Sequence, residues 1–315
     1  MEFITNTIIN KLDKSDPIAI TFLDLAKAFD TVDHKLLLKK LYNYGIRGNA
    51  HQLISSYLSG RFQKVRVNGV YSESLGVSMG IPQGTILGPL LFILYVNDLL
   101  TGMPEGEIVS FADDTAVVAT GKTWTQIEQK ANNQLKIISV WLALNKLSLN
   151  IDKTVYITFG NYCNSVPLNF NLQLNNSNIQ RAENCKYLGV YIDYKINWGL
   201  HIEKIIKKTK YLIFIFHKLA ELMQQKTLMI IYYALFHSVI SYGIIAWGGA
   251  FPTQLIILER LQTKILKIIN KNKFVTNNYP CNIHQQYALE SLLYHYDSLK
   301  SAFIMSNSKT RYKSL

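Results

Sequence analysis

Two adjacent aspartates, Asp113 and Asp114, interrupt the otherwise apolar, strand-like segment SFADDTAVVA at residues 110–119. Ionised carboxylates are rarely found among apolar residues unless a partner or a metal compensates them, and these two would also repel each other. A third carboxylate, Asp24, ends the β-branched and aromatic run IAITFLD at residues 18–24. If the two strands are neighbours in one sheet, the three carboxylates converge. The pattern then predicts a cation between them.

Each aspartate alone also fits a plainer interpretation, as a turn residue, a helix N-cap or a satisfied surface charge. Together they favour a hard divalent cation such as Mg²⁺, which takes oxygen ligands and is commonly held by carboxylates plus substrate phosphates. Two such ions about 3.5–4 Å apart activate an attacking hydroxyl and stabilise a leaving phosphate. The expected chemistry is therefore metal-assisted transfer at a phosphate.

Charge and composition narrow the class of protein. The formal net charge is +12, and residues 195–273 hold twelve Lys or Arg against three Asp or Glu, which favours a polyanionic partner. Hydrophobic residues make up 49% of the 315 residues, enough for a large core. The three cysteines are widely spaced and fit neither a disulfide framework nor a zinc site. The first residues lack signal-peptide features, so an intracellular location in cytoplasm or nucleus is expected.

One segment tests a membrane interpretation. Residues 227–258 carry no Lys, Arg, Asp or Glu and are long enough to span a bilayer. However, the segment contains His237, Ser238 and Ser241 and a Gly-Gly break, and basic residues flank it. A buried pair of helices is the better prediction, with no membrane partner.

Hydrophobic periodicity predicts a mixture of strands and helices, that is, an α+β fold. A composition change at about residues 195–200 marks the domain boundary. The expected strands and hairpins cover residues 18–24, 61–80 with a turn at Asn68-Gly69, 107–119, 150–159 and 185–193, and the expected helices cover residues 33–45, 49–58, 89–100, 124–142 and the chain from His201 onward.

Six motifs occur in one order: FLDLAKAFDTVDH (22–34), SYLSGRFQKV (56–65), GIPQGTILGPLLFILYVNDL (80–99), FADDT (111–115), LNIDKT (149–154) and KYLGVYID (186–193). Together they resemble the palm of a reverse transcriptase, most closely those of non-LTR (LINE-type, jockey-like) retrotransposons. The resemblance covers roughly residues 18–250. A group II intron maturase is the nearest competing relative, but SYLSGR and KAFDTVDH favour the retrotransposon group.

The resemblance implies a right-hand polymerase fold: a remnant at residues 1–17, a palm with an antiparallel sheet and packed helices at 18–195, a basic helical thumb and following helices at 196–275, and a C-terminal tail at 276–315. It implies that Asp24, Asp113 and Asp114 form the catalytic triad of acids. These residues would hold two Mg²⁺ ions, for which Mn²⁺ can substitute. Lys153 matches the lysine proposed to protonate the departing pyrophosphate, although a solvated lysine is the plainer interpretation.

Further residues match substrate-binding positions. Phe29 matches the bulky gate under the sugar of the incoming nucleotide, although by itself it suggests a core phenylalanine. The template and nucleotide loop comprises Gly80, Pro82, Gln83 and Gly84, which also fit a simple turn. The primer grip comprises Lys186, Tyr187, Leu188 and Gly189, of which Tyr187 and Leu188 equally fit a core. Contacts to the nucleic-acid backbone are expected from Arg61, Lys64, Arg66, Lys204, Lys207, Lys208 and Lys210, or these are solvated charges.

The implied function is RNA-directed DNA polymerisation by two-metal nucleotidyl transfer, with an RNA template, a DNA primer and deoxynucleoside triphosphates as partners. The alternative is an inactive nucleic-acid-binding remnant. A third class, a membrane or partner-binding helical protein built on residues 227–258, is disfavoured by the acids and the GIPQG loop. Complete members of the family carry a fingers region before the palm strand and further domains. We therefore expect a truncated fragment with weak or no polymerase activity on its own.

Overall fold

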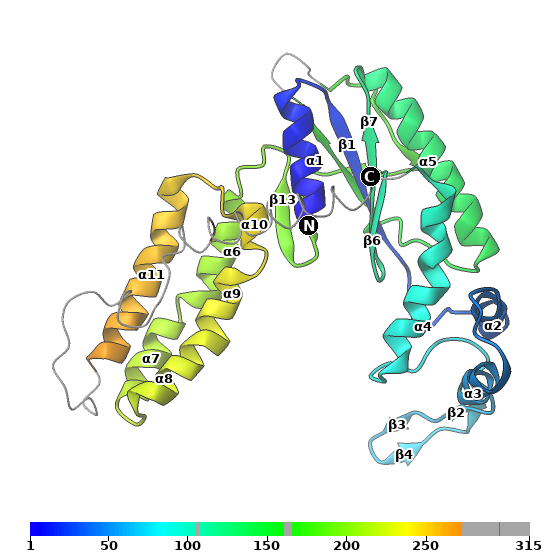
Figure 1. Ribbon diagram of the computed structural model, residues 1–315, viewed down its shortest axis with the longest axis horizontal. Coiled ribbons are helices and arrows are strands. Elements are labelled where there is room, and N and C mark those ends of the chain that lie inside the picture. The colour runs from blue at the N-terminus through cyan, green and yellow to red at the C-terminus, as the bar shows by residue number, and fades with distance from the viewer. Residues whose placement is uncertain (105–106, 161–165, 272–295, 297–315) are drawn as a thin grey trace, which may run out of the picture. The chain divides into compact units, whose positions relative to one another are not determined.

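The computed structural model describes residues 1–104, 107–160, 166–271 and 296 (Figure 1). The chain forms two compact units. The sheet unit comprises Ile8–Glu183, and the helical unit comprises Met1–Thr7 with the chain from Asn184 onward. Helix α1 (Glu2–Asp13) contains the division between them. The predicted tail at residues 276–315 lies outside the described residues, apart from residue 296.

A five-stranded sheet forms the centre of the sheet unit, in the order β11-β8-β1-β7-β6. Its pairs are antiparallel except for the parallel pair β11 with β8. The bounds are β1 Ile18–Asp24, β6 Ile108–Phe111, β7 Asp114–Thr120, β8 Val155–Phe159 and β11 Gln180–Arg181. Strand β1 is buried along all but its last residue, because strands flank it on both sides and a helix packs on the sheet. This explains its continuous apolar run.

Helices supply the rest of the core. Helix α5 (Trp124–Leu144) packs on β7 and β1 through residues at helical spacing, including Ile127, Leu135 and Ile138. The other helices of the unit are α2 (His34–Asn43), α3 (Gly48–Leu58), α4 (Leu87–Val96) and the 3₁₀ helix η1 (Asn97–Gly102). The Asp33 side chain caps α2 by accepting a hydrogen bond from the Leu36 N–H, as expected for a helix starting there.

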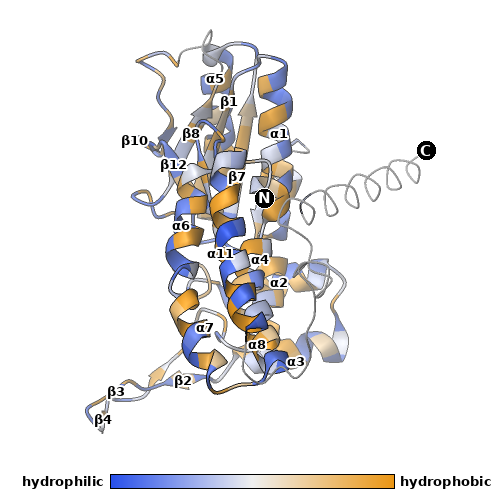
Figure 2. Cartoon of the chain, turned by 90° about the vertical axis from the view of Figure 1, so that its left-hand side faces the viewer, coloured by the Kyte–Doolittle hydropathy of each residue, from blue (hydrophilic) through white to orange (hydrophobic). Residues whose placement is uncertain are grey.

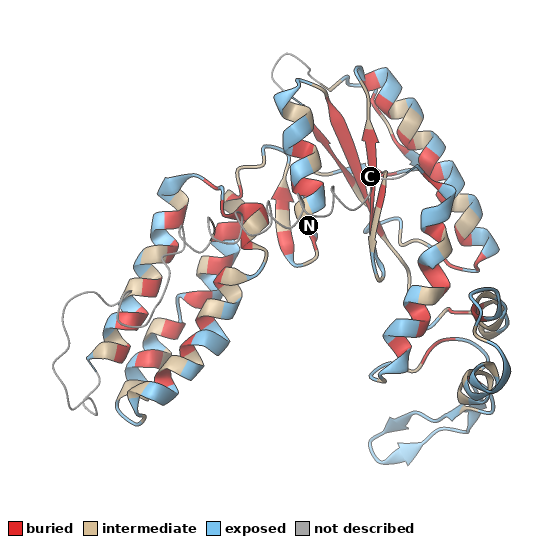
Figure 3. Ribbon diagram, viewed as in Figure 1, coloured by how far each residue is buried: buried red, intermediate tan, exposed pale blue. Residues whose placement is uncertain are grey.

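A ribbon of short strands extends from the sheet unit into solvent. It comprises β2 (Phe62–Gln63), β3 (Arg66–Val67), β4 (Val70–Tyr71) and β5 (Leu75–Gly76), all exposed (Figure 3). Asn68 and Gly69 both have positive φ, +50° and +86°, which is the backbone of a type I′ turn. The predicted hairpin and its turn are confirmed. A second short ribbon pairs β9 (Gln173–Leu174) with β10 (Ser177–Asn178).

The helical unit begins with a hairpin, β12 (Asn184–Tyr187) and β13 (Val190–Asp193), and continues as amphipathic helices (Figure 2). The helices are α6 (Gly199–Thr209), α7 (Leu212–Ala220), α8 (Gln225–Tyr232), the π-helical turn η2 (Tyr233–His237), α9 (Ser238–Ser241), α10 (Ile244–Trp247) and α11 (Pro252–Asn270).

The sequence predicted a buried pair of helices over residues 227–258, whereas the structure has more than two helical segments there. Helical structure runs without interruption over residues 225–241, stops at Gly243 with φ +64°, resumes as α10, and begins again at Pro252. The backbone at Gly243 packs closely against the β12–β13 hairpin, since a Cβ at Gly243 would lie 3.0 Å from Val190 Cγ2. Within the described ranges, no helix is both long and apolar enough to cross a membrane.

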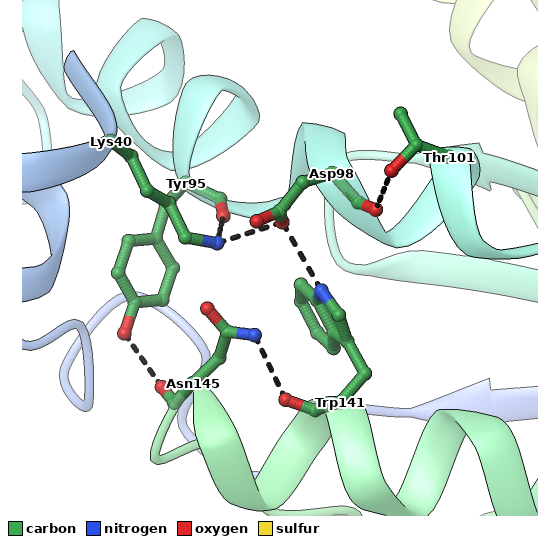
Figure 4. A network of polar contacts seen from close by, with 6 residues as sticks. All are labelled: Lys40, Tyr95, Asp98, Thr101, Trp141 and Asn145. Atoms are coloured by element: carbon green, nitrogen blue, oxygen red, sulfur yellow. Dashed lines mark hydrogen bonds and ion pairs between the residues drawn. The ribbon is translucent and has the colours of Figure 1, made fainter. Parts of the chain in front are cut away.

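A polar network joins four elements of the sheet unit (Figure 4). The Lys40 ammonium on α2 donates to the Tyr95 carbonyl at 2.6 Å and to Asp98 Oδ1 at 2.7 Å. Trp141 Nε1 on α5 donates to the same carboxylate oxygen at 3.1 Å. Burial lowers the pKa of Lys40, and Asp98 partly offsets this effect. The network therefore links α2, α4, η1 and α5 to one another.

We expect Lys40→Met to lower the free energy of unfolding by about 1–3 kcal/mol. The methionine keeps the aliphatic packing, but the Asp98 carboxylate and the Tyr95 carbonyl lose a donor. Lys39→Met, at the exposed neighbouring position, is the matched control and should change stability by less than about 0.5 kcal/mol. Denaturant unfolding of both variants measures the difference. Equal losses would show that the network contributes nothing specific.

Candidate active site

The pairing of β1 with β7 brings the predicted acids to one end of the sheet. Asp24, the last residue of β1, lies directly opposite Asp114, the first residue of β7. Phe111 of β6 also pairs with Asp114, so Ala112 and Asp113 form the two-residue turn of the β6–β7 hairpin. Ala112 adopts a positive φ of +54° there. Residues opposite each other across two strands project from the same face, so Asp24 and Asp114 share one side of the sheet.

The acids are more solvated than their apolar sequence context suggested. Asp113 and Asp114 are exposed and Asp24 is half-buried, because the buried part of β7 begins only at Thr115. Nearby protein atoms still remove part of the hydration of the Asp114 carboxyl. This desolvation, followed by the negative charges of Asp113 and Asp24, raises the pKa of Asp114. The three carboxylates therefore lie close enough to repel one another.

Lys153 lies beside Asp24. Its Nζ is 3.9 Å from Asp24 Oδ2, in an exposed ion pair that contributes little to stability. Two hydrogen bonds attach the turn before β8 to the backbone of Asp24. The Asn150 N–H donates to the Asp24 carbonyl at 2.8 Å, and the Asp24 N–H donates to the Thr154 side-chain Oγ1 at 3.3 Å. Thr154 is fully buried and anchors this turn. The lysine is thus held close to the first acid.

The donors of this cluster are carboxylate oxygens, the type that Mg²⁺ prefers, and their mutual repulsion is what a bound cation relieves. Among the described residues, no group of three or more His, Cys, Asp or Glu is arranged so that it could hold a metal ion. A cation here would therefore need further oxygen ligands from substrate phosphates or water. On donor chemistry the residues fit a hard divalent ion.

The GIPQG loop is attached to the segment that follows Asp24. The Ile81 N–H donates to the Phe29 carbonyl at 2.8 Å, and the Gly80 N–H donates to the Val32 carbonyl at 2.8 Å. Gln83 Nε2 donates to Asp30 Oδ1 at 3.0 Å. These hydrogen bonds therefore hold the loop against the segment that directly follows β1. Gln83 and Gly84 are exposed, whereas Gly80 is buried.

Phe29 is half-buried and stacks on Phe92 of α4, with ring centroids 4.5 Å apart and planes at 26°. This contact anchors the ring in the core, as the plainer interpretation expected. The contact neither requires nor prevents a role as a sugar gate, which stays a prediction.

The other predicted residues lie elsewhere. Lys186, Tyr187, Leu188 and Gly189 form the end of the β12–β13 hairpin in the helical unit, where Leu188 and Gly189 have positive φ. The predicted lysines on and just after α6, Lys204, Lys207, Lys208 and Lys210, are exposed, and Arg61, Lys64 and Arg66 lie on or beside the exposed ribbon.

Sequence reasoning missed two residues that position the site. His34 Nε2 forms a 2.8 Å hydrogen bond with the Gly80 carbonyl, and Asp30 binds Gln83. Both lie inside the FLDLAKAFDTVDH motif, so their position between Asp24 and the next helix was the available signal.

Gly80→Ala should lower the free energy of unfolding by at least about 1 kcal/mol more than Gly84→Ala. Both glycines have positive φ, +84° and +76°, so both alanines are strained in the backbone. Only at Gly80 would the new Cβ lie 2.8 Å from the Asp30 carbonyl oxygen, while Gly84 faces open space. Denaturant unfolding distinguishes the two. Equal losses would contradict the close approach of the loop to Asp30.

Asp114→Asn should make the protein more stable than the parent at pH 7. A folded-state pKa above the unfolded one means that ionising Asp114 opposes folding. This unfavourable contribution is complete above the folded-state pKa and disappears once the pH falls below the unfolded-state value, near 4. Unfolding at pH 7 and pH 3 tests this, with Asp13→Asn on α1 as the control. A stability gain that persists at pH 3 would have another cause.

Comparisons with known proteins show the family of the chain. The chain matches the family model for reverse transcriptase (RNA-dependent DNA polymerase) over residues 2–192. It is 28% identical over 281 residues to the RNA-directed DNA polymerase from mobile element jockey of Drosophila funebris, covering 85% of this chain and 30% of that protein. It is 25% identical over 282 residues to the probable RNA-directed DNA polymerase from transposon BS of Drosophila melanogaster, covering 84% and 30%.

One solved structure with a similar fold is telomerase from Candida albicans in complex with the TWJ fragment of telomeric RNA. The TM-score is 0.52 at 15% identity, and the match covers 95% of this chain and 48% of that one. This likeness concerns the fold alone and, with the antiparallel sheet and the packed helices, confirms the predicted α+β polymerase architecture. The chain spans 30% of the length of the two mobile-element polymerases. Because the family model matches more than half of its residues, the chain belongs to the reverse transcriptase (RNA-dependent DNA polymerase) family.

Proposed function

We propose that this chain carries out RNA-directed DNA polymerisation of the non-LTR retrotransposon type. The primer 3′-hydroxyl attacks the α-phosphate of a deoxynucleoside triphosphate, one P–O bond forms, another breaks, and pyrophosphate leaves. The observation that carries the proposal is the pairing of Asp24 with Asp114 beside the Asp113 turn, at one end of a reverse transcriptase sheet.

Asp24 and Asp113 are the proposed ligands of two Mg²⁺ or Mn²⁺ ions, with Asp114 as the third acid. The pKa of Asp114 is raised first by desolvation and then by the negative charges of Asp113 and Asp24, and this second effect supports the assignment of the three acids to one site. When bound, such ions supply activation of the attacking hydroxyl and stabilisation of the leaving phosphate. The carboxylates keep the donor set purely oxygen, which suits hard cations.

Lys153 is the proposed general acid. Its Nζ lies 3.9 Å from Asp24 Oδ2, so a proton carried there is next to the proposed metal-holding acid. The turn that carries it is held by Asn150 and Thr154, which limits its movement. Donation of that proton to the leaving pyrophosphate avoids the release of a more highly charged anion.

Substrate positioning is assigned to the loop and to Phe29. Gly80, Pro82, Gln83 and Gly84 would lie against template and nucleotide, with the loop held by its bonds to Phe29 and Val32. The Phe29 ring, braced by Phe92, would exclude the 2′-hydroxyl of a ribonucleotide.

An RNA template and a DNA primer are the proposed partners. The basic chain from residue 196 to 275, which follows a palm at residues 18–195 in the sequence, would act as the thumb on their phosphate backbone. We propose an intracellular location, in cytoplasm or nucleus, because the proposed partners are nucleic acids and nucleotides.

Primer extension on an oligo(dT)–poly(rA) duplex with Mg²⁺ or Mn²⁺ tests the proposal. We expect weak extension that requires the metal and falls at least about 100-fold in Asp113→Ala, because several kcal/mol of transition-state stabilisation are lost. Asp13→Ala, an exposed carboxylate on α1, is the control and should extend like the parent.

The inactive-remnant alternative gives a different result. It is favoured by one observation, that no three acids among the described residues form a ready metal site. In that case the chain would bind the duplex with strong salt dependence yet extend no primer with either ion, and Asp113→Ala would change nothing.

A further inference from the structure

The central sheet of the sheet unit ends at β6, whose outer edge is open (Figure 1). Among the described residues, β6 pairs with β7 and with no other strand. The Val118 N–H donates to the Glu107 carbonyl at 2.7 Å, so the backbone of Glu107 faces β7. Because this direction alternates along an antiparallel strand, the N–H and C=O groups of Ile108 and Ser110 point away from β7. The edge therefore offers donors and acceptors to a further strand.

A pocket lies next to the start of this edge. Its volume is about 470 Å³, which is in the range of ligand-binding sites. Glu107, the residue just before β6, lines one side together with Met103 and Pro104. The other side is one face of α5, formed by residues three or four apart between Gln126 and Ile137. A strand that paired with β6 and continued past its start would reach this pocket.

Gln134 of α5 lines the pocket and carries an unsatisfied acceptor. The residue is 4% exposed, and its Nε2 donates to Glu107 Oε2 at 2.7 Å and to the Val118 carbonyl at 3.1 Å. Both partners are acceptors, so the amide cannot be turned round and Oε1 is its other end. This Oε1 is buried and has no hydrogen-bond partner among the described residues. An unpaired buried acceptor costs free energy, which a donor entering the pocket would recover.

The pocket has no net charge, unlike the basic surfaces of the chain. Lys130 Nζ lies 2.6 Å from Glu107 Oε1, so the two formal charges among the described lining residues cancel. A polyanion therefore gains no electrostatic attraction here. Met103 and Ile137 add apolar surface beside the amides of α5. The lining suits a neutral side chain that has an aliphatic stem and a donor at its end.

We infer that β6 and this pocket form a docking site for an extended strand of a partner protein. The strand pairs with Ile108 and Ser110 and places a neutral donor, the side-chain amide of Gln or Asn, next to Gln134 Oε1. In such strand addition, backbone hydrogen bonds supply affinity and a side-chain pocket supplies specificity. Because β6 has only four residues, the pocket is what selects the partner. The site is separate from the three acids and does not depend on polymerase activity.

The test uses the full chain and a set of blocked, fluorescent peptides, Thr-Val-Thr-X-Thr-Val-Thr, that differ only at X and cover every residue type. Their β-branched residues favour an extended backbone. Fluorescence anisotropy should show the tightest binding when X is Gln or Asn. Hydrogen exchange of the Ile108 and Ser110 amides should slow in the complex, because both N–H groups become donors to the added strand.

Two variants separate the edge from the pocket. Ser110→Pro removes an outward N–H and should weaken every peptide at least about tenfold, whereas Ser110→Ala keeps that N–H and should bind like the parent. Gln134→Met removes the buried acceptor and should weaken only the Gln and Asn peptides, by about three- to tenfold. Thr125→Met, exposed on α5 outside the pocket, is its control and should change nothing.

Thermal unfolding checks that each variant is folded. If Gln134→Met does not fold, Ile137→Lys takes its place, because that position is 47% exposed and the new ammonium competes for Gln134 Oε1. The preference for Gln and Asn at X should then disappear.

Three results would overturn the docking site: no binding by any peptide, binding without preference at X, or binding that Ser110→Pro leaves unchanged. Sedimentation of the parent chain tests a second copy as the occupant. A dimer that Ser110→Pro converts to monomers would assign the edge to that copy and overturn the partner strand. Primer extension is not among these measurements, so a failure of the polymerase proposal is distinguished from a failure of the docking site.

Discussion

The register of β1 against β7 is the constraint on which the candidate active site depends. Side chains alternate between the two faces of a strand, so a shift of one residue would move Asp24 away from Asp114 and turn one of them to the opposite face. The register is set by the buried residues of the two strands, since Ile18, Ile20 and Phe22 of β1 all have partners along β7. The core thus determines where the charges meet.

The charges themselves oppose this arrangement. Like charges directly opposite each other across two strands are destabilising, and the β6–β7 turn adds Asp113 to the pair. The site is tolerated because it lies at the end of the sheet, where water reaches Asp113 and Asp114 and Lys153 lies near Asp24. Functional sites commonly retain such unfavourable charge, because a bound cation or substrate compensates it only when it is needed.

Around this point, backbone hydrogen bonds connect segments that are distant in the chain. The loop beginning at Gly80 and the turn at Asn150 both bind the segment that includes Asp24 and Phe29. The polar network of Lys40, Asp98 and Trp141 joins α2, η1 and α5 of the same unit. In the helical unit, the hydrogen bond from the Tyr242 hydroxyl to the Leu188 carbonyl likewise connects distant segments, because it holds the turn of the β12–β13 hairpin.

Sequence alone determined the local elements and the chemistry of the acids. Alternation and apolar runs predicted β1, the exposed ribbon with its Asn68-Gly69 turn, and α5, since these depend on local propensity and on periodic burial. Motif order predicted the reverse transcriptase family, now shown by the family model. Tertiary structure alone decided that Asp113 and Asp114 are solvated, that Phe29 stacks on Phe92, and that residues 225–258 break into several helices. It also decided that Gln134 of α5 shares a pocket with Glu107. Solvation, ring stacking and shared pockets depend on neighbours supplied by other parts of the chain, and no local pattern encodes them.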